Sequence, residues 1–408
     1  MRISRSLKLT VPVAALAMAA VACGSSGSSG GGGGGGKPTF TIAYQGPLSG
    51  GNAQLGLNMS FAVKLAVNQA NAGTTFGSLP FTLKFAQEDD QGTDTAAPAA
   101  VAKVLQISNL IAVVGPAFSG ATAASEPTYS KAGVATVSPS ATAPNLATSG
   151  WHNFFRVVAD DNSQGPADAL YMGKVAHLKK VYVVDDASTY AAGLAKAFIN
   201  SASSNGLSVV KHDTAPASSQ CVQGSSGSVQ QYGPLASKIK NSGADSVFYA
   251  GYYCDFALLA KQLHSAGFSG QLVSDDGSND SHYVSQAGAS VANGTLISCA
   301  CQETITGSAF SSFAKAFKPV AGFAAGTYSA EAYDATNSII SVMKAKGASV
   351  SKQDVINGLH APGFSYQGVS KTVTFAPNGN YGGKAVYMYK VENGTIKELG
   401  LVSQLAGG

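Results

Sequence analysis

Short β-branched or aromatic segments alternate with longer amphipathic segments along most of this chain. Such alternation predicts βαβ units, in which parallel strands form sheets with helices on both faces. We expect strands near 40–44, 81–85, 111–114, 134–137, 181–184, 207–211, 246–249 and 271–274. We expect helices ending near Asn71 and Ala132, and helices near 93–109, 164–177, 189–204, 230–242 and 255–266. The predicted fold class is α/β.

The last third of the chain has a different order of elements. It reads as helices near 308–318, 326–346 and 351–359, then as strands near 372–375 and 384–390. A closing pair of strands after helices indicates that the chain returns to complete sheets begun earlier. The earlier part divides into two α/β halves near residue 158, and a body of about 370 residues exceeds the usual size of one core. We therefore expect two lobes.

The N-terminus has the pattern of an export signal. Three basic residues precede an uncharged apolar run over 9–22, which is too short to span a bilayer. Cys23 follows, and then 13 Gly/Ser residues at 24–36, with a root-mean-square span of about 20 Å. The string Ala20-Val21-Ala22-Cys23 resembles the lipobox of bacterial lipoproteins, although leucine is commoner where Ala20 stands.

We therefore expect a signal peptide at 1–22, and a lipidated (palmitate-bearing) Cys23 with a flexible tether at 23–37. The mature protein would be extracytoplasmic and anchored to the bacterial cell membrane by this N-terminal lipid alone. The alternative is an ordinary signal peptide with an incidental cysteine.

The charge balance argues against nucleic acid as a partner. The formal charge of +4 includes the three basic residues of the signal, and their removal leaves 23 basic against 22 acidic side chains. Charged residues make up 12% of the chain, and no stretch is basic enough to follow a phosphate backbone.

Four further cysteines fit export, because an even number in an exported chain indicates disulfides. We favour Cys221–Cys254, which joins a polar loop to the end of a strand. Cys299 and Cys301 lie two apart in an expected strand, where a bond between them would be strained. No CxxC pair occurs and the six histidines are scattered, so we expect neither a metal nor another cofactor.

Ligands of open parallel sheets bind beyond the carboxyl ends of the strands. Three loops of the first half occupy such places, at 45–56, 115–122 and 138–144. The last two place Ser119 and Thr142 among small residues at the start of a helix or turn, where unpaired N–H groups suit a carboxylate or phosphate. The alternative is that these hydroxyls only cap helices.

The matching loops of the second half, at 185–193, 250–256 and 274–280, carry Tyr190, Tyr252 and Asp276. An ammonium group gains from a carboxylate and from aromatic faces. Together the two halves would suit the two charged groups of an amino acid. The alternative is that Asp276 is a turn residue and that Tyr252 covers a core.

From about residue 40 to 396 the chain resembles the leucine/isoleucine/valine-binding proteins of ABC importers, a branched-chain type of periplasmic binding protein type I. The resemblance rests on an ordered series of motifs: IAYQGPLSGGNAQLG, VVGPAFSG, VSPSATAP, FFRVVADDNSQGP, VYVVDDASTYAAGLA, VFYAGYY and AGTYSAEAYDA. It implies a monomeric, non-enzymatic protein that binds an amino acid and delivers it to the permease of an ABC transporter.

The resemblance also implies two lobes, each a mainly parallel sheet flanked by helices, joined by a three-crossing hinge. Lobe 1 would comprise 38–158 plus 301–370, and lobe 2 would comprise 159–300 plus 371–408. The crossings would fall near 156–161, 298–303 and 368–375.

Carried onto this chain, the family's site gives each residue a role. Ser119 and Thr142 would bind the ligand's α-carboxylate, the Ala141 carbonyl and Asp276 its ammonium, and Phe118 would line the wall. The remaining members of the implied set are Leu55, Tyr190 and Tyr252.

Two positions depart from leucine-binding members of the family. Those members have an aromatic residue where Leu55 stands and glutamate where Asp276 stands. The missing methylene withdraws the carboxylate by about 1–1.5 Å. Leucine, isoleucine or valine is thus the family's default ligand rather than one that these residues establish.

Two other functions remain open on the sequence. An exported hydrolase would need a nucleophile with a positioned base, yet no GxSxG motif occurs and the nearest histidine is the isolated His282. A sensor of amino acids or small amides that signals without transport would use the same fold.

Overall fold

The computed structural model describes residues 36–222, 227–228, 231–302 and 308–407. All elements lie in the unit Lys37–Gly408. The expected signal peptide, the lipidation site Cys23 and nearly all of the expected tether lie outside the described residues.

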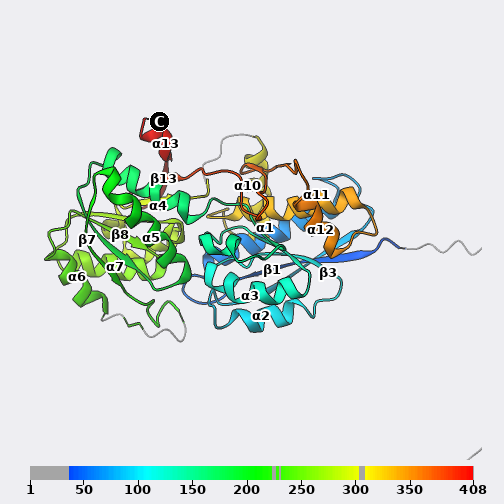
Figure 1. The fold of residues 1–408 in the computed structure, drawn as a ribbon, viewed down its shortest axis with the longest axis horizontal. Helices are drawn as coiled ribbons and strands as arrows, with labels where there is room; N and C mark the ends of the chain where they lie inside the picture. The colour runs from blue at the N-terminus through cyan, green and yellow to red at the C-terminus, as the bar shows by residue number, and fades with distance from the viewer. Residues whose placement is uncertain (1–35, 223–226, 229–230, 303–307, 408) are drawn as a thin grey trace, which may run out of the picture. The chain divides into compact units, whose positions relative to one another are not determined.

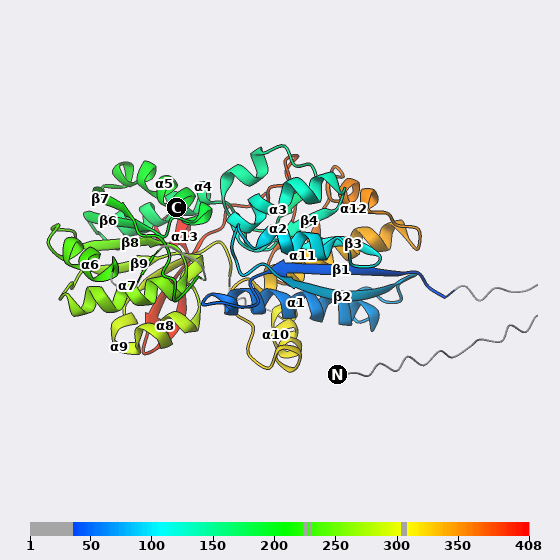
Figure 2. The same cartoon turned by 90° about the horizontal axis from the view of Figure 1, so that it is seen from below.

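The first sheet of the described chain has five parallel strands in the order β2-β1-β3-β4-β5. The fully buried strand β3 lies at its centre, as expected for a parallel sheet covered on both faces. Helix α1 lies on one face, and α2 and α3 lie on the other (Figure 2). The bounds are β1 Thr39–Gly46, α1 Ala53–Asn71, β2 Thr82–Asp89, α2 Ala97–Val104, β3 Leu110–Val114, α3 Ser119–Lys131, β4 Ala135–Ser138 and β5 Phe154–Arg156.

The second sheet has seven described strands in the order β14-β13-β10-β9-β8-β6-β7. Strands β6 to β10 run parallel to one another. Strand β13 pairs antiparallel with both β10 and β14. The edge strand β7 exposes charged side chains, which discourage pairing with another chain. The bounds are α4 Asp161–Leu170, β6 Lys180–Asp185, α5 Thr189–Ala202, β7 Ser208–Thr214, α6 Tyr232–Lys240, β8 Ser246–Ala250, α7 Tyr253–Ser265, β9 Gln271–Ser274, α8 Ser281–Ala287, α9 Ala289–Ala292, β10 Leu296–Cys299, β13 Tyr387–Glu392, β14 Thr395–Leu401 and α13 Val402–Leu405.

Each sheet with its helices forms a lobe (Figure 1). After β10 the chain returns to lobe 1, because α11 packs against α1, β3 and β4, and α12 packs against β3 and β4. A two-stranded hairpin of β11 and β12 follows. The bounds are α10 Ser308–Ala321, α11 Ser329–Lys346, α12 Lys352–Leu359, β11 Tyr366–Gln367 and β12 Thr372–Val373.

The chain therefore passes between the lobes three times: after β5, after β10 and before β13. The third passage is later than the predicted 368–375. The Arg156 N–H donates to the Gly379 carbonyl at 3.0 Å, so Gly379 still lies with β5 of lobe 1.

Some element boundaries differ from the sequence-based expectation. The helix predicted over 93–109 is confined to α2, which has proline in its first turn. The predicted last strand begins at Tyr387 rather than at 384, and β14 was not predicted. Asn393 and Gly394 join β13 to β14 with positive φ angles of 53° and 78°, the conformation that an Asn-Gly hairpin turn provides. That dipeptide was the available signal for β14.

Candidate ligand-binding site

A narrow cavity lies where the two lobes meet, at the carboxyl ends of their parallel strands. Six residues of the site expected from sequence line it together: Leu55, Phe118, Ser119, Tyr190, Tyr252 and Asp276. Four further residues complete the lining: Ala117, Ser140, Gly277 and Tyr328.

Asp276 follows β9 and is the most heavily hydrogen-bonded side chain of the cavity. Its Oδ1 accepts from Gln164 Nε2 and from the Tyr190 hydroxyl, both at 2.7 Å. Its Oδ2 accepts from the Tyr328 hydroxyl at 2.7 Å, which joins lobe 1 to lobe 2. Burial raises the pKa of Asp276, while these three donors act to lower it. The carboxyl group is therefore fixed in position, with one oxygen accepting from a single donor.

Asp275, its neighbour, has a structural role. It is fully buried and accepts from the backbone N–H groups of Gly251 at 3.0 Å and Gly277 at 3.1 Å. Burial raises the pKa of Asp275, and the nearby charge of Asp276 raises it further. Asp275 thus holds the turn that presents Asp276.

Two aromatic rings meet across the cavity. Phe118 precedes α3 in lobe 1 and Tyr252 precedes α7 in lobe 2, and their rings stack with centroids 4.3 Å apart and planes 18° apart. Tyr190, in the first turn of α5, lies 5.4 Å from Tyr252. Because the N-cap side chains of α3 and α7 stack on each other, the N-termini of the two helices meet at the cavity and add positive potential there.

The lobe 1 side of the cavity offers small residues and hydroxyls. Ser119 Oγ accepts from the Ala143 N–H at 3.2 Å, which leaves its own hydrogen available to a ligand. Ser140 Oγ instead donates to the Ala117 carbonyl at 2.7 Å. Ser119 is thus the hydroxyl of this side that can donate to an anion.

Ala141 and Thr142, expected to contact the ligand, are fully buried and do not line the cavity. The Ala141 carbonyl accepts from Arg156 Nη1 at 3.1 Å, so a buried guanidinium already occupies the acceptor expected to bind an ammonium. The Thr142 hydroxyl lies near the Asp161 carboxyl, whose pKa is raised by burial. The two groups are not hydrogen-bonded to each other, and neither has another hydrogen-bond partner among the described residues. A ligand role for either residue stays a prediction.

Tyr328 and Gln164 are contacts of Asp276 that the sequence analysis did not assign. Tyr328 precedes α11 and has a backbone φ of 65°, which is uncommon for residues other than glycine or asparagine. Its motif, AGTYSAEAYDA, contributes to the family resemblance, but no pattern in the motif indicates that the tyrosine side chain contacts the other lobe.

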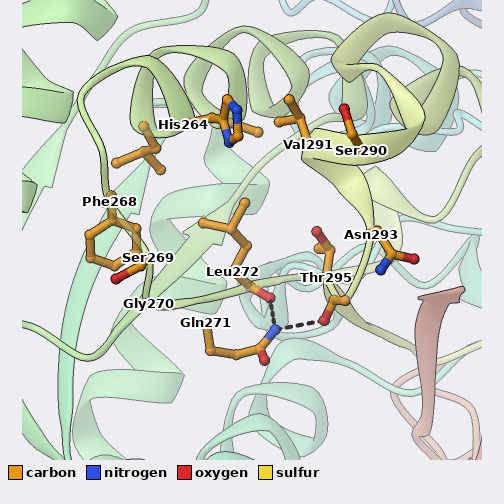
Figure 3. Close-up of a pocket in the computed structure, with 13 residues that line it drawn as sticks. His264, Phe268, Ser269, Gly270, Gln271, Leu272, Ser290, Val291, Asn293 and Thr295 are labelled. Atoms are coloured by element: carbon orange, nitrogen blue, oxygen red, sulfur yellow. Dashed lines mark hydrogen bonds between the residues drawn. The ribbon is translucent and has the colours of Figure 1, made fainter.

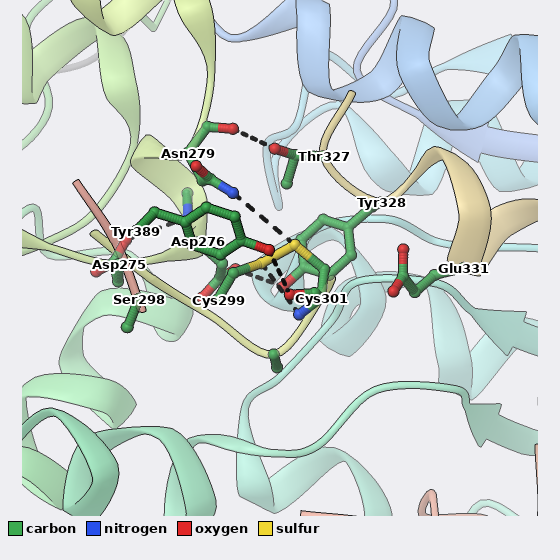
Figure 4. Close-up of a disulfide and its surroundings, with 12 residues drawn as sticks. Asp275, Asp276, Asn279, Ser298, Cys299, Cys301, Thr327, Tyr328, Glu331 and Tyr389 are labelled. Carbon is green, nitrogen blue, oxygen red and sulfur yellow. Dashed lines mark hydrogen bonds between the residues drawn. A yellow bond between two sulfur atoms is a disulfide. The ribbon is translucent and has the colours of Figure 1, made fainter. Parts of the chain in front are cut away.

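Two disulfides are present among the described residues. One joins Cys221 to Cys254. The other joins Cys299 to Cys301 beside Asp276 and Tyr328 (Figure 4), a pair whose bond we expected to be strained. Strand β10 ends at Cys299, so the two cysteines do not share an extended segment. Their Cα atoms are 4.9 Å apart, against about 6.6 Å for two residues along a strand.

A larger, open hollow lies elsewhere on lobe 2, around His264, Phe268 and Gln271 (Figure 3). It adjoins the amino ends of β9 and β10, away from the strand ends where such folds bind ligands. Gln271 Nε2 is already engaged there by the carbonyls of Leu272 and Gly294, each at 2.8 Å. None of the expected site residues lines it. The inter-lobe cavity is therefore the better candidate.

Two absences hold for the residues that the structure describes. No three His, Cys, Asp or Glu side chains among them are grouped to hold a metal ion. No helix in the same ranges is both long and apolar enough to cross a bilayer.

A hinged pair of α/β lobes that enclose a cavity defines a solute-binding protein. The family model described as periplasmic binding protein matches residues 39–395. A Leu/Ile/Val-binding protein homolog of Brucella melitensis is 27% identical over 87% of this chain and 92% of its own length. The chain therefore belongs to the periplasmic binding protein family.

Solved structures agree on the fold. The branched-chain amino acid transporter substrate binding protein LivJ from Streptococcus pneumoniae, in complex with isoleucine, superposes with a TM-score of 0.77 at 26% identity, over 89% of this chain and 99% of that one. A leucine binding protein, LivK, from Thermotoga maritima gives a TM-score of 0.76 at 22% identity, over 89% and 98%.

Proposed function

We propose that this protein captures an amino acid, of branched-chain type or related to it, between its lobes and delivers it to the permease of an ABC transporter. One observation carries the proposal. The Asp276 carboxyl and the Ser119 hydroxyl at the N-terminus of α3 line one cavity from opposite lobes. An acid opposite an anion-binding helix end suits a zwitterion.

The ammonium would bind at Asp276. Its three present partners are neutral donors, so no cationic side chain among them neutralises the carboxylate. A ligand ammonium would supply that charge, and the face of the Tyr252 ring would add a cation–π contribution. The carboxylate would bind at Ser119 and the backbone N–H groups that begin α3.

The apolar part of the ligand would contact Leu55 and the stacked rings of Phe118 and Tyr252. Leu55 takes less space than an aromatic ring and Asp276 is shorter than glutamate. The cleft therefore favours ligands with a larger side chain or an ammonium of longer reach over leucine. The proposed cycle contains binding and release and no catalytic step.

The division into lobes follows the crossings, with lobe 1 comprising 38–158 and 301–380 and lobe 2 comprising 159–300 and 381–408. The last boundary is moved from residue 370, because Gly379 pairs with β5 and Lys371 forms a 3.0 Å ion pair with Glu331 of α11. We further propose that the monomeric protein is held at the outer surface by a lipid on Cys23, as its lipobox-like sequence indicates.

Calorimetry with a panel of α- and γ-amino acids tests the function. Asp276→Asn keeps the shape of the side chain and removes its charge, so we expect it to abolish measurable binding of the tightest ligand. Glu392→Gln is the matched control, because that carboxylate is 40% exposed on the β13–β14 hairpin. Equal affinity of wild type and Asp276→Asn would refute the binding mode.

A further inference from the structure

Beside the cavity, the loop before α1 in lobe 1 is joined to lobe 2 by two hydrogen bonds. The Gly51 N–H, in the loop before α1, donates to the Cys221 carbonyl at 3.0 Å. The Cys254 N–H, in the first turn of α7, donates to Asn52 Oδ1 at 3.3 Å. Cys221 and Cys254 are the two ends of one disulfide. The loop of lobe 1 thus contacts lobe 2 at that disulfide.

The same two segments continue into the cavity. Two residues after Asn52, in the first turn of α1, the Gln54 N–H donates to the Tyr253 hydroxyl at 3.4 Å. The next residue, Leu55, and the residue before Tyr253, Tyr252, both line the cavity. The contact between the loops is therefore continuous with the ligand site.

The lobe 2 side of this contact is held firmly. The disulfide joins two residues 33 positions apart in the sequence and connects the loop of Cys221 to the start of α7. Asp255, next to Cys254, accepts from the Ser218 N–H at 2.6 Å and from the Tyr232 hydroxyl at 2.9 Å. These bonds fix the carbonyl that Gly51 uses.

Gly51 is required for close approach. A Cβ at this position would lie 2.8 Å from the Cys221 Cα and carbonyl oxygen and 3.0 Å from Cys254 Sγ. The first two are backbone atoms, which cannot move aside as a flexible side chain does. The φ of Gly51 is not in the left-handed region, so its backbone conformation alone would admit alanine.

We propose that the Cys221–Cys254 disulfide and the Gly51–Asn52 turn form a latch that holds the lobes closed on the ligand. The proposal rests on the proposed function, in that closure retains the bound solute. Because apparent affinity scales with the population of the closed state, a weakened latch raises the dissociation constant. The latch makes ligand affinity depend on an oxidised Cys221–Cys254 pair.

Two variants test the latch against a matched control. Gly51→Ala places a methyl group into the contact, and the double variant Cys221→Ser with Cys254→Ser removes the bond. Gly233→Ala is the control, because the Cβ of this α6 residue would lie 3.6 Å from the flexible Gln262 side chain of α7, an ordinary van der Waals contact. We expect the dissociation constant to rise at least tenfold in both test variants and less than twofold in the control, mainly through faster release.

Distances between spin labels on unnatural residues at the exposed positions 64 and 261 report closure independently of affinity. We expect the liganded wild type and control to share one narrow distribution, and the test variants to add an open population. Identical distributions and affinities in all four proteins would overturn the latch. If the double serine variant does not fold, the dissociation constant and the distance distribution of Gly51→Ala alone test the latch.

The two proposals fail differently. If wild type binds no amino acid of the panel and the ligand-free distances still change in Gly51→Ala, the proposed ligand class is wrong and the latch stands. If wild type binds an amino acid and Gly51→Ala binds it equally well in the same closed state, the latch is wrong and the function stands.

Discussion

Lobe 1 and lobe 2 line the cavity with different chemistry. Lobe 1 contributes no charged side chain to the lining and offers the Ser119 hydroxyl with the N-terminus of α3. Lobe 2 contributes the Asp276 carboxyl, held by three side-chain donors. An anion site built partly from backbone N–H groups still binds after one side chain is removed. A cation site that depends on one carboxylate loses its binding when that carboxylate is removed. The lobes should therefore differ in their sensitivity to substitution.

The largest effect is expected at Asp276. Asp276→Ala leaves a buried ligand ammonium without its counter-ion, which costs about 3–5 kcal/mol of binding free energy. Calorimetry with an α-amino acid measures the loss. Tyr328→Phe is the control, because it removes the inter-lobe hydrogen bond to Asp276 but keeps the charge. Equal losses in both variants would mean that Asp276 acts through lobe contact alone.

A smaller loss is expected at Ser119. Ser119→Ala removes one hydrogen bond to a charged ligand group, worth about 1.5–3 kcal/mol, and leaves the backbone N–H groups of α3 in place. The same titration gives the value. A loss as large as that of Asp276→Ala would contradict the proposed difference between the lobes.

Specificity provides a finer test of the lobe 2 side. Asp276→Glu restores the reach to a short ammonium, so it should favour α-amino acids over γ-amino acids by about 1–3 kcal/mol, the usual worth of one methylene. Competition among leucine, valine, phenylalanine and γ-aminobutyrate measures the ranking. If the wild type already prefers leucine and the variant ranks the ligands in the same order, a small change in lobe closure compensates for the shorter reach of Asp276.

Sequence and structure agree where local chemistry decides the outcome. Buried strands such as β3 and β8 follow from their apolar runs, and the parallel topology brings Ser119 and Asp276 to one cavity. Contacts that depend on the tertiary path were not predictable in the same way. Tyr328 reaches Asp276 from a helix about 50 residues later in the chain, and Arg156 occupies the Ala141 carbonyl only because β5 buries it there.

In stability, unlike ligand binding, the lobes should behave alike, because each buries carboxyl groups. Burial raises the pKa of Glu126 in lobe 1 to about 8 from its ordinary 4.5, and that of Asp255 in lobe 2 to about 7. The folded state then binds more protons than the unfolded state, so the free energy of unfolding should fall as pH rises from about 5 to 8. The slope for each group is at most about 1.4 kcal/mol per pH unit.

Glu126→Gln should flatten this dependence, which denaturant unfolding at several pH values measures. Asn153 donates to Glu126 at 2.9 Å and can still pair with the amide oxygen, so the variant keeps the local contact. A slope unchanged by the substitution would show that Glu126 is ionised in the folded protein near neutral pH.

The smallest effect on affinity is expected at Thr142. Its hydroxyl faces Asp161 rather than the cavity, so Thr142→Val should change the binding free energy by less than about 0.5 kcal/mol. The same variant should change the free energy of unfolding by less than about 1 kcal/mol, because the buried hydroxyl has no hydrogen-bond partner among the described residues. Calorimetry and denaturant unfolding on one preparation separate the two quantities. An affinity loss equal to that of Ser119→Ala, with stability unchanged, would instead place Thr142 on the ligand and give lobe 1 a second hydroxyl contact.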